Sequence, residues 1–576
     1  MTDVAVQPVP PSASRRAVWI ATALGFACGL PYSLLVGSVS VWLTNAGIGF
    51  GTIGALSWIG LFYAFKFIWS PAFDWLVPPF ANTIGRRRAW IALCQAVIAL
   101  CLFGMTFFNP LVNITAFALF AVLAAFASAS QDIVVDAWRI ETAADGKQLD
   151  KITVQYQLGY RLAAIVGGAV ALLLADLWAL ADNPAAGWPT IWAIMAVLMA
   201  CLIGATLAAP EPVVAPRPQS TTAVTPENQT LRRRAALPVA IGWAIAAVAL
   251  LGFMFYTLAD PSANAAEFRD AATPWILLLT IGLPLGISYW LARKPGVLET
   301  GAGGRAFADI LFERVLAPLA DIVRRYWVWA LPILALAMTY RIADSIWGSF
   351  ANPFYVGIMQ YSNSDVAVAS KMIGVVMTLA GIALGGVALV WIGRMPSLII
   401  GGIVAAATNL LYADLARGGV WIDGFLNATG LGAVFDWALR GFVGAVQGAG
   451  ATIFDGVTLG APLNRLTAII AMENLAGGFA SAVHIAWLSS IVNKNYAAVQ
   501  YALLSSLALL IGVIFRPRIG AYVDAVSEQG LPAQAERFAE VFVFAAWIGA
   551  VAIALAALEW WRQSRVAATE ANAATA

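Results

Sequence analysis

Long apolar windows recur along the whole chain, and they constrain its fold more than any other feature of the sequence. About 20 consecutive apolar residues are enough for a helix to cross the hydrocarbon core of a bilayer. We place fourteen such windows near 17–43, 52–76, 89–108, 111–136, 155–177, 188–208, 237–258, 274–292, 327–350, 366–391, 396–414, 466–490, 497–520 and 539–561. The composition agrees, because 61% of the residues are hydrophobic and 11% are charged, against about 25% charged in soluble proteins. The sequence therefore predicts an all-α, polytopic membrane protein.

Basic residues are distributed unequally between the two sides of this predicted topology. The clusters Arg15–Arg16, Arg86–Arg88, Arg232–Arg234 and Arg324–Arg325 all fall in loops on the side of the N-terminus. The opposite side carries only Arg269, Arg417, Arg440, Arg465 and Arg537. Since cytoplasmic loops carry the excess of Lys and Arg, we expect both termini in the cytoplasm. The first apolar run is too long for a signal peptide and lacks a cleavage site, so we interpret it as a retained helix.

Two linkers divide the windows into groups. The segment 210–236 is rich in Pro and Thr, and 305–325 has an apolar helical face that predicts an amphipathic helix on the cytoplasmic leaflet. Setting aside the two windows between these linkers leaves six helices on each side, the layout of a major-facilitator transporter. The predicted organisation is a six-helix bundle (1–209), a linker (210–236), two extra transmembrane helices (237–292), a linker with the amphipathic helix (293–326), a second six-helix bundle (327–565) and a tail (566–576). Within the second bundle, the Gly-rich insert 417–465 predicts periplasmic amphipathic or re-entrant pieces.

Ionisable residues inside the predicted spans carry the functional signal. A charged side chain near the bilayer centre costs about 2.5–3.5 kcal/mol on insertion scales, so such groups must face one another or a wet cavity. The candidates are Lys66, Asp132, Asp136, Arg161, Arg341, Asp344 and Glu473. The chain has one histidine, His484, and its four cysteines lie in apolar windows, so we expect no metal site, no cofactor and no disulfide framework. We interpret His484 as a packed residue.

The stretch FASASQDIVVDAWR ends one predicted span with several polar residues. Asp132, Asp136 and Arg139 follow one another at about one helical turn, so they share a face. Arg139 can pair with Asp136, and we expect Asp132 to pair with Arg161 on the next helix. A cluster of this kind can exchange protons for changes in pairing, which is what a proton-coupled carrier needs. The alternative is a fixed salt-bridge network that locks two helices together.

The remaining polar candidates have predicted roles in binding or gating. We expect Lys66, Gln131, Tyr160, Arg161, Arg341, Asp344 and Asn474 to contact substrate, and Glu473 to share proton coupling with Asp132 and Asp136. Lys66 can alternatively snorkel towards the surface, and Arg341 and Asp344 can pair within their own helix. We expect Gly29, Asp74, Arg86, Arg87 and Arg88 to act in gating, with the arginines pairing to acids or helix ends; alternatively, the arginines only set topology.

Several motifs together resemble the AmpG muropeptide permease family of the major-facilitator superfamily. They are GFACGLPYSL, YAFKFIWSPAFD, GRRRAW, SASQDIVVDAW, LGYRLA, LAAPEP, MENLAGG and VNKNYAAVQYALLSSL, and they follow the family order from about residue 25 to 525. The resemblance implies importance for Gly29, Gln131, Asp132, Asp136 and Arg161. The insert 417–465 and His484 depart from the family pattern, and the insert puts the exact substrate range in doubt, though not the substrate class.

The resemblance implies a bacterial inner-membrane importer, driven by the proton motive force, that carries anhydromuropeptides to the cytoplasm for peptidoglycan recycling. Such transport tunes β-lactamase induction, and hence antibiotic resistance, where that circuit exists. We expect a monomer whose partners are the substrate, protons and the bilayer; the net charge of +2 argues against nucleic acid. The alternative within the same fold is a carrier of another anionic solute, such as acetyl-CoA. We expect no enzyme, because the sequence lacks a nucleophile or metal motif, and a non-transporting receptor is the other alternative.

Overall fold

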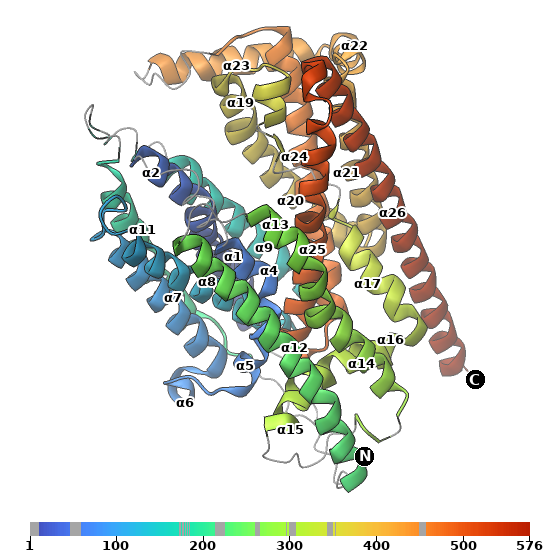
Figure 1. The fold of residues 1–576 in the computed structure, drawn as a ribbon. Coiled ribbons are helices and arrows are strands. Elements are labelled where there is room, and N and C mark those ends of the chain that lie inside the picture. The colour runs from blue at the N-terminus through green and yellow to red at the C-terminus, as the bar shows by residue number, and fades with distance from the viewer. Residues whose placement is uncertain are drawn as a thin grey trace. The chain divides into compact units, whose positions relative to one another are not determined.

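The chain folds into two helical units (Figure 1). The computed structural model describes residues 11–46, 59–171, 174–175, 178, 180, 183, 185–212, 225–259, 265–294, 296–298, 307–342, 350–351, 353–448 and 457–575. Within these ranges every regular element is a helix. Unit 1 comprises Met1–Ala330 and Ser489–Ser506, and unit 2 comprises Leu331–Leu488 and Leu507–Ala576. The short segment Ser489–Ser506 therefore belongs to unit 1, although the chain on both sides of it belongs to unit 2.

Unit 1 is held together by helices that approach one another at glycines. Its helices are α1 (Pro11–Tyr32), α2 (Val39–Asn45), α4 (Gly60–Phe65), α5 (Ser70–Trp75), α6 (Ala81–Ile84), α7 (Arg86–Met105), α8 (Ile114–Thr142), α9 (Gly146–Ala164), α11 (Trp188–Ala208), α12 (Pro226–Ala259), α13 (Ala265–Leu277), α14 (Leu283–Ala292), α15 (Phe307–Leu311) and α16 (Ala317–Tyr326). Between α1 and α9, a Cβ on Gly25 would lie 2.0 Å from the carbonyl oxygen of Tyr156, and one on Gly159 would lie 1.9 Å from that of Thr22. Only glycine permits this backbone approach, which is typical of membrane helix pairs.

Unit 2 is organised in the same way. Its helices are α17 (Ala330–Thr339), α19 (Asn363–Ala367), α20 (Gly374–Trp391), α21 (Arg394–Ala416), α22 (Val420–Thr429), α23 (Leu431–Gly448), most of α24 (Ala461–Ile491), most of α25 (Ala497–Asp524) and α26 (Leu531–Thr575). A Cβ on Gly381 of α20 would lie 2.1 Å from the carbonyl oxygen of Leu475 on α24, and one on Gly478 would lie 2.3 Å from that of Thr378.

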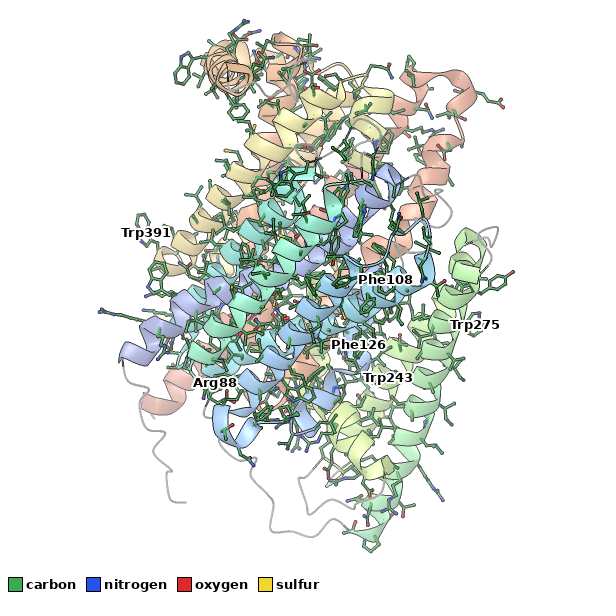
Figure 2. All side chains as sticks on the ribbon, turned by 90° about the vertical axis from the view of Figure 1, so that its left-hand side faces the viewer. Arg88, Phe108, Phe126, Trp243, Trp275 and Trp391 are labelled. Carbon is green, nitrogen blue, oxygen red and sulfur yellow. The ribbon has the colours of Figure 1, made fainter. Side chains whose placement is uncertain are left out.

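Eleven helices of the described residues are long and apolar enough to cross a membrane. Each overlaps one of the predicted windows, but Phe312–Thr339 begins inside the segment 305–325 that was predicted to lie on the leaflet, and it shares only residues 327–339 with the window 327–350. The other three windows, near 52–76, 155–177 and 497–520, are helical over their described parts: α4 and α5, α9 with its π-helical extension Ile165–Val170, and α25. Large apolar side chains such as Trp275 (67% exposed) and Trp391 (83% exposed) lie on the outside of their units (Figure 2). An apolar exterior of this kind suits contact with lipid, and the chain is a multi-pass membrane protein.

The two extra helices lie where the sequence places them. The candidate spans Pro226–Phe253 and Ala271–Ala292 overlap both predicted windows, and the indole of Trp243 donates to the carbonyl of Thr280 between them. α12 begins at Pro226, so the last part of the predicted linker 210–236 is helical. Residues 213–224 of that linker lie outside the described residues.

The predicted amphipathic helix at 305–325 is helical over its described part, from Phe307 onwards, but its apolar face is not available to lipid. Val315, Leu319 and Ile322 are at most 3% exposed, because α15 and α16 pack against α12 and α14 within unit 1. Amphipathicity alone does not distinguish burial against protein from burial in a leaflet, since both need one apolar face.

Candidate functional site

The end of α8 is enclosed by protein on all sides. Every residue from Ala127 to Thr142 is buried, including the polar residues Gln131, Asp132, Asp136 and Arg139. The helix begins at a side-chain cap, where Asn113 accepts from the backbone N–H of Ala116. Its alanine-rich sequence lets neighbouring elements approach closely. Buried charge on an interior helix therefore has to be balanced by other side chains.

Four charged side chains form a continuous buried chain of ion pairs. The Nζ of Lys66 lies 3.9 Å from Oδ2 of Asp132 and 3.4 Å from Oδ2 of Asp136. Arg139 Nη2 lies 3.2 Å from the other oxygen of Asp136. The predicted Asp136–Arg139 pair is thus confirmed. The expectation that Asp132 pairs with Arg161 is wrong, because the cation beside Asp132 is Lys66. The two cations and two carboxylates balance when all four are ionised.

Lys66 reaches this chain because its helix changes form at that point. α4 ends at Phe65, a single 3-10 turn spans Lys66–Ile68, and α5 begins at Ser70. Two hydrogen bonds tie this broken segment to α8: Tyr63 to Ser128 at 2.8 Å and Trp69 to Ser130 at 3.2 Å. Lys66 is 6% exposed, so it does not snorkel to the surface. Broken helices at charged sites are a recurrent feature of transporters.

Arg139 connects the ion-pair chain to a distant part of the sequence. Its Nη1 donates to the hydroxyls of Thr153 at 2.7 Å and Ser489 at 2.9 Å. Its guanidinium also lies over the rings of Tyr156 (5.2 Å) and Tyr501 (4.9 Å). Such cation–π contacts suit a guanidinium that is fully buried. Sequence reasoning missed Ser489 and Tyr501, although both lie in or beside the motif VNKNYAAVQYALLSSL.

Two buried acceptors beside the ion pairs have no hydrogen-bond donor among the described residues. They are Oδ1 of Asp132 and Oε1 of Gln131, and the amide nitrogen of Gln131 lies 3.5 Å from the sulfur of Cys28. Buried acceptors normally have a partner. This spot can therefore take a proton, a water molecule or a donor from a bound solute.

Tyr160, Arg161 and Gly29 lie around the contact between α1 and α9. Tyr160 is half-buried and its ring lies 6.1 Å from that of Tyr32, which in turn lies 4.8 Å edge-on from Tyr63. A Cβ on Gly29 would lie 2.5 Å from the carbonyl oxygen of Tyr160. Gly29 therefore has a packing role that requires glycine, whatever its role in gating. Arg161 is half-buried on α9.

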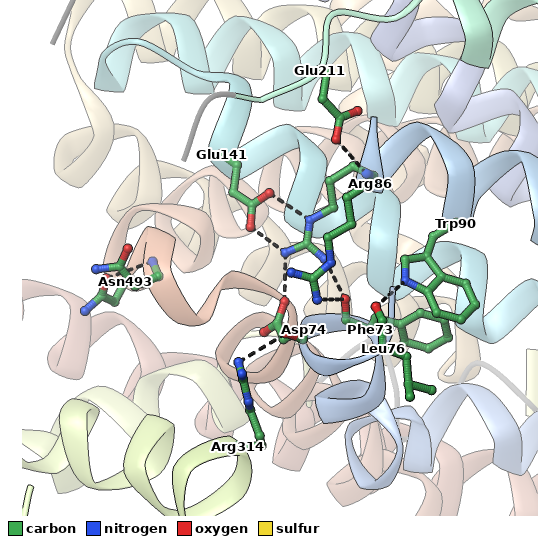
Figure 3. A network of polar contacts seen from close by, with 11 residues as sticks. Phe73, Asp74, Leu76, Arg86, Trp90, Glu141, Glu211, Arg314 and Asn493 are labelled. Carbon is green, nitrogen blue, oxygen red and sulfur yellow. Dashed lines mark hydrogen bonds and ion pairs between the residues drawn. The ribbon is translucent and has the colours of Figure 1, made fainter. Parts of the chain in front are cut away.

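The arginines Arg86–Arg88 form a second polar network in unit 1 (Figure 3). Arg87 is buried and donates to Asp74 at 2.8 Å and to both oxygens of Glu141 at 2.8 and 2.5 Å. Arg86 donates to the carbonyl of Phe73, and Arg88 lies 3.5 Å from Glu211. The predicted pairing of these arginines with acids is thus confirmed for Arg87 and Arg88. Sequence reasoning missed Glu141 and Glu211 as their partners.

The candidates of the second half lie in unit 2. Arg341 donates to the carbonyl of Gly477 at 2.8 Å. The amide of Asn474 donates to Glu473 at 2.8 Å and accepts from Thr378 at 2.8 Å, which ties α24 to α20. Asp344, the expected partner of Arg341, lies outside the described residues. His484 is buried and stacks on Tyr340 and Trp487, as expected of a packed residue.

Comparison with known proteins relates the chain to transporters. The anhydromuropeptide permease of Escherichia coli (strain K12) is 28% identical over 502 residues, which cover 87% of this chain and 73% of the permease. The chain is thus similar to the anhydromuropeptide permeases over most of its length. The putative transporter AmpG 4 of Rickettsia conorii is 23% identical over 84% of this chain and 85% of its own length. Residues 17–166 also match the family model described as acetyl-coenzyme A transporter 1.

The fold has solved counterparts as well. The proton:xylose symporter XylE, bound to 6-bromo-6-deoxy-D-glucose, matches with a TM-score of 0.52 at 12% identity over 94% of this chain and 95% of that one. The chain thus has the major-facilitator fold that its helix layout predicts. The two relatives and this solved counterpart are named as a permease, a putative transporter and a symporter.

Proposed function

We propose that this chain transports anhydromuropeptides across the bacterial inner membrane and that it couples this import to protons. The observation that carries the proposal is the buried chain Lys66–Asp132/Asp136–Arg139 in a protein similar to the anhydromuropeptide permeases. Muropeptides carry free carboxylates on their peptide part, and buried cations suit carboxylates. The proposal keeps the predicted topology, with both termini in the cytoplasm.

The charge balance of the site supports proton coupling. With both aspartates ionised, Lys66 and Arg139 are neutralised, and an added substrate carboxylate would leave an uncompensated buried anion. When one aspartate takes up a proton, a cation is released for that carboxylate. Asp132 is the better candidate for the proton carrier, because only one cation lies beside it, at 3.9 Å, and its second oxygen has no donor among the described residues.

Arg139 offers a route from this proton exchange to a conformational change. It contacts Asp136 on one side and Ser489 and Tyr501 on the other. Neutralisation of the aspartates would weaken the electrostatic support of the guanidinium and so loosen its contacts with Ser489–Ser506. Ser489–Ser506 lies in unit 1 with Arg139, but the chain continues from both of its ends into unit 2, so these contacts are candidates to change in each transport cycle.

Uptake by proteoliposomes tests the proposal. Labelled anhydromuropeptide should accumulate in vesicles of the wild type under an inward proton gradient. Asp132→Asn should abolish accumulation but retain exchange of labelled for unlabelled substrate, because asparagine has nearly the shape of aspartate but cannot take up and release a proton. Asp436→Asn, which removes the charge of a partly exposed aspartate of α23, is the matched control and should transport normally. If the wild type binds the substrate without accumulating it, the proposal that the protein is a carrier is refuted.

Acetyl-CoA is the second candidate substrate, and the family match over residues 17–166 favours it. That match covers only the first part of the chain, whereas the permease similarity extends over 502 residues. Competition decides between them: excess unlabelled anhydromuropeptide should suppress uptake of the labelled form, and acetyl-CoA should not. Suppression by acetyl-CoA alone would reverse the assignment.

A further inference from the structure

The insert between α21 and α24 folds into two helices, α22 and α23, that leave apolar surface exposed. Both neighbouring helices are candidate membrane spans, and α22 begins at Val420, shortly after α21 ends at Ala416. Within unit 2, α23 lies crosswise to α21 and α24 (Figure 1). The two helices therefore lie at the level where spans leave the bilayer, and α23 does not continue in their direction.

Only part of the apolar face of α23 packs against protein. Leu439 and Val443 are buried and contact Val368 and Leu463. On the same helix Leu431 is 37%, Val434 55% and Trp437 77% exposed. At 100° per residue, Leu431 and Val434 extend the apolar arc beyond its protein-covered part, whereas Ala433, Asp436 and Arg440 lie on the opposite side.

The shorter helix α22 repeats this division. Ile422 and Leu426 are buried in the core of unit 2. Val420 (73%), Trp421 (82%) and Phe425 (46%) are exposed. Asp423 is turned to Arg465 and forms an ion pair with it. Each helix of the insert therefore has one side on the protein, one apolar side without a protein partner among the described residues, and one polar side.

The charges of the insert are neutralised in pairs. Its three arginines each have a carboxylate: Arg417 has Glu536 at 2.6 Å, Arg440 has Asp436 at 2.6 Å, and Arg465 has Asp423. Hydrogen bonding to Arg440 also keeps the pKa of Asp436 below its usual range. A surface without net positive charge does not attract anionic lipid headgroups or anionic wall fragments electrostatically.

We propose that α22 and α23 form an interfacial helix pair whose exposed apolar side lies in the boundary between headgroups and acyl chains, in the leaflet where α21 ends. In the predicted topology this is the outer leaflet. The exposed Trp, Phe and Val side chains suit that boundary, and the adjacent spans hold the helix pair at the level of the boundary. Binding is apolar and does not depend on lipid charge. The proposal is independent of the transported substrate.

Site-directed spin labelling of the reconstituted full chain tests this. The exposed Cys201 is replaced by alanine, and the parent without an added cysteine measures any labelling of the buried Cys28, Cys94 and Cys101. Nitroxides are placed at Val434→Cys and Phe425→Cys on the apolar side. Ala433→Cys and Asn427→Cys, both exposed on the same helices, are the matched controls. Collision rates with oxygen, which partitions into lipid, and with a water-soluble nickel chelate report the depth.

The expected result is an oxygen-to-nickel ratio several-fold higher at Val434→Cys and Phe425→Cys than at their controls. The ratio should be unchanged between vesicles with and without anionic lipid, and between low and high salt. Equal access of the nickel chelate to all four positions would place the helix pair in water and overturn the proposal. Immobile nitroxides that neither reagent reaches would indicate a protein partner or a second copy, and would also overturn it.

Discussion

Arg139 donates a hydrogen bond to the hydroxyl of Ser489 at 2.9 Å, although the two residues are 350 positions apart in sequence. The same guanidinium lies 3.2 Å from Asp136. One buried side chain thus joins the aspartates of α8 to the segment Ser489–Ser506. In the proposed proton coupling, Arg139 is therefore the residue that connects the aspartates to this segment.

Arg139→Gln should reduce proton-driven uptake by about tenfold or more. Hydrogen bonds to charged groups contribute about 1.5–3 kcal/mol each, and the substitution removes several together with two cation–π contacts. Ser489→Ala removes one hydrogen-bond acceptor of Arg139 and should reduce uptake by less. The measurement is the initial rate of uptake, with size-exclusion chromatography to establish folding. Equal rates for Arg139→Gln and the wild type would contradict a coupling role.

Lys66→Met should destabilise the protein more than the double substitution Lys66→Met with Asp136→Asn. Removal of one partner from a buried ion pair costs about 3–5 kcal/mol, because the remaining charge is left uncompensated. Removal of both a cation and a carboxylate keeps the site balanced. Thermal unfolding in detergent measures this in a double-mutant cycle. If the two substitutions have strictly additive effects on stability, Lys66 and Asp136 do not interact.

Arg87→Ala should lower the melting temperature much more than Arg88→Ala. Arg87 is 6% exposed and bonds two carboxylates, whereas Arg88 lies near the surface beside Glu211. Exposed pairs contribute about 0–1 kcal/mol, against several kcal/mol for a buried network. Glu141→Gln should also lower the melting temperature, though by less than Arg87→Ala. Similar melting temperatures for the Arg87 and Arg88 variants would show that the network does not stabilise unit 1.

Gly159→Ala should prevent correct packing of α1 against α9. Its Cβ would lie 1.9 Å from the carbonyl oxygen of Thr22, and this backbone atom cannot move aside without shifting a helix. Gly204→Ala on α11 is the matched control, because a Cβ there meets nothing within 4 Å. The yield of monodisperse protein measures the effect. Normal yield of the Gly159 variant would mean that the two helices pack less closely than described.

Local relationships along a helix were predictable from the sequence. Asp136 and Arg139 are three residues apart, so helix geometry alone places them on one face, and the pair forms. The partner of Asp132 was not predictable in this way. Lys66 approaches it from a helix that breaks at that position, and the alternative cation, Arg161, fits the spacing equally well. Such choices depend on how helices pack, which no local pattern encodes.

The bilayer itself explains which properties the sequence determined. A helix in hydrocarbon must be apolar over its whole length and must satisfy its own backbone, so the spans, the helical fold and the rarity of buried charge are visible in composition alone. Tertiary structure decided the partners of Lys66 and Arg87 and the contact of Arg139 with Ser489, because these partners lie between 13 and 350 residues away. Tertiary structure also decided what covers the apolar face of 305–325. Its pattern requires burial, but only the surrounding helices determine whether protein or lipid covers it.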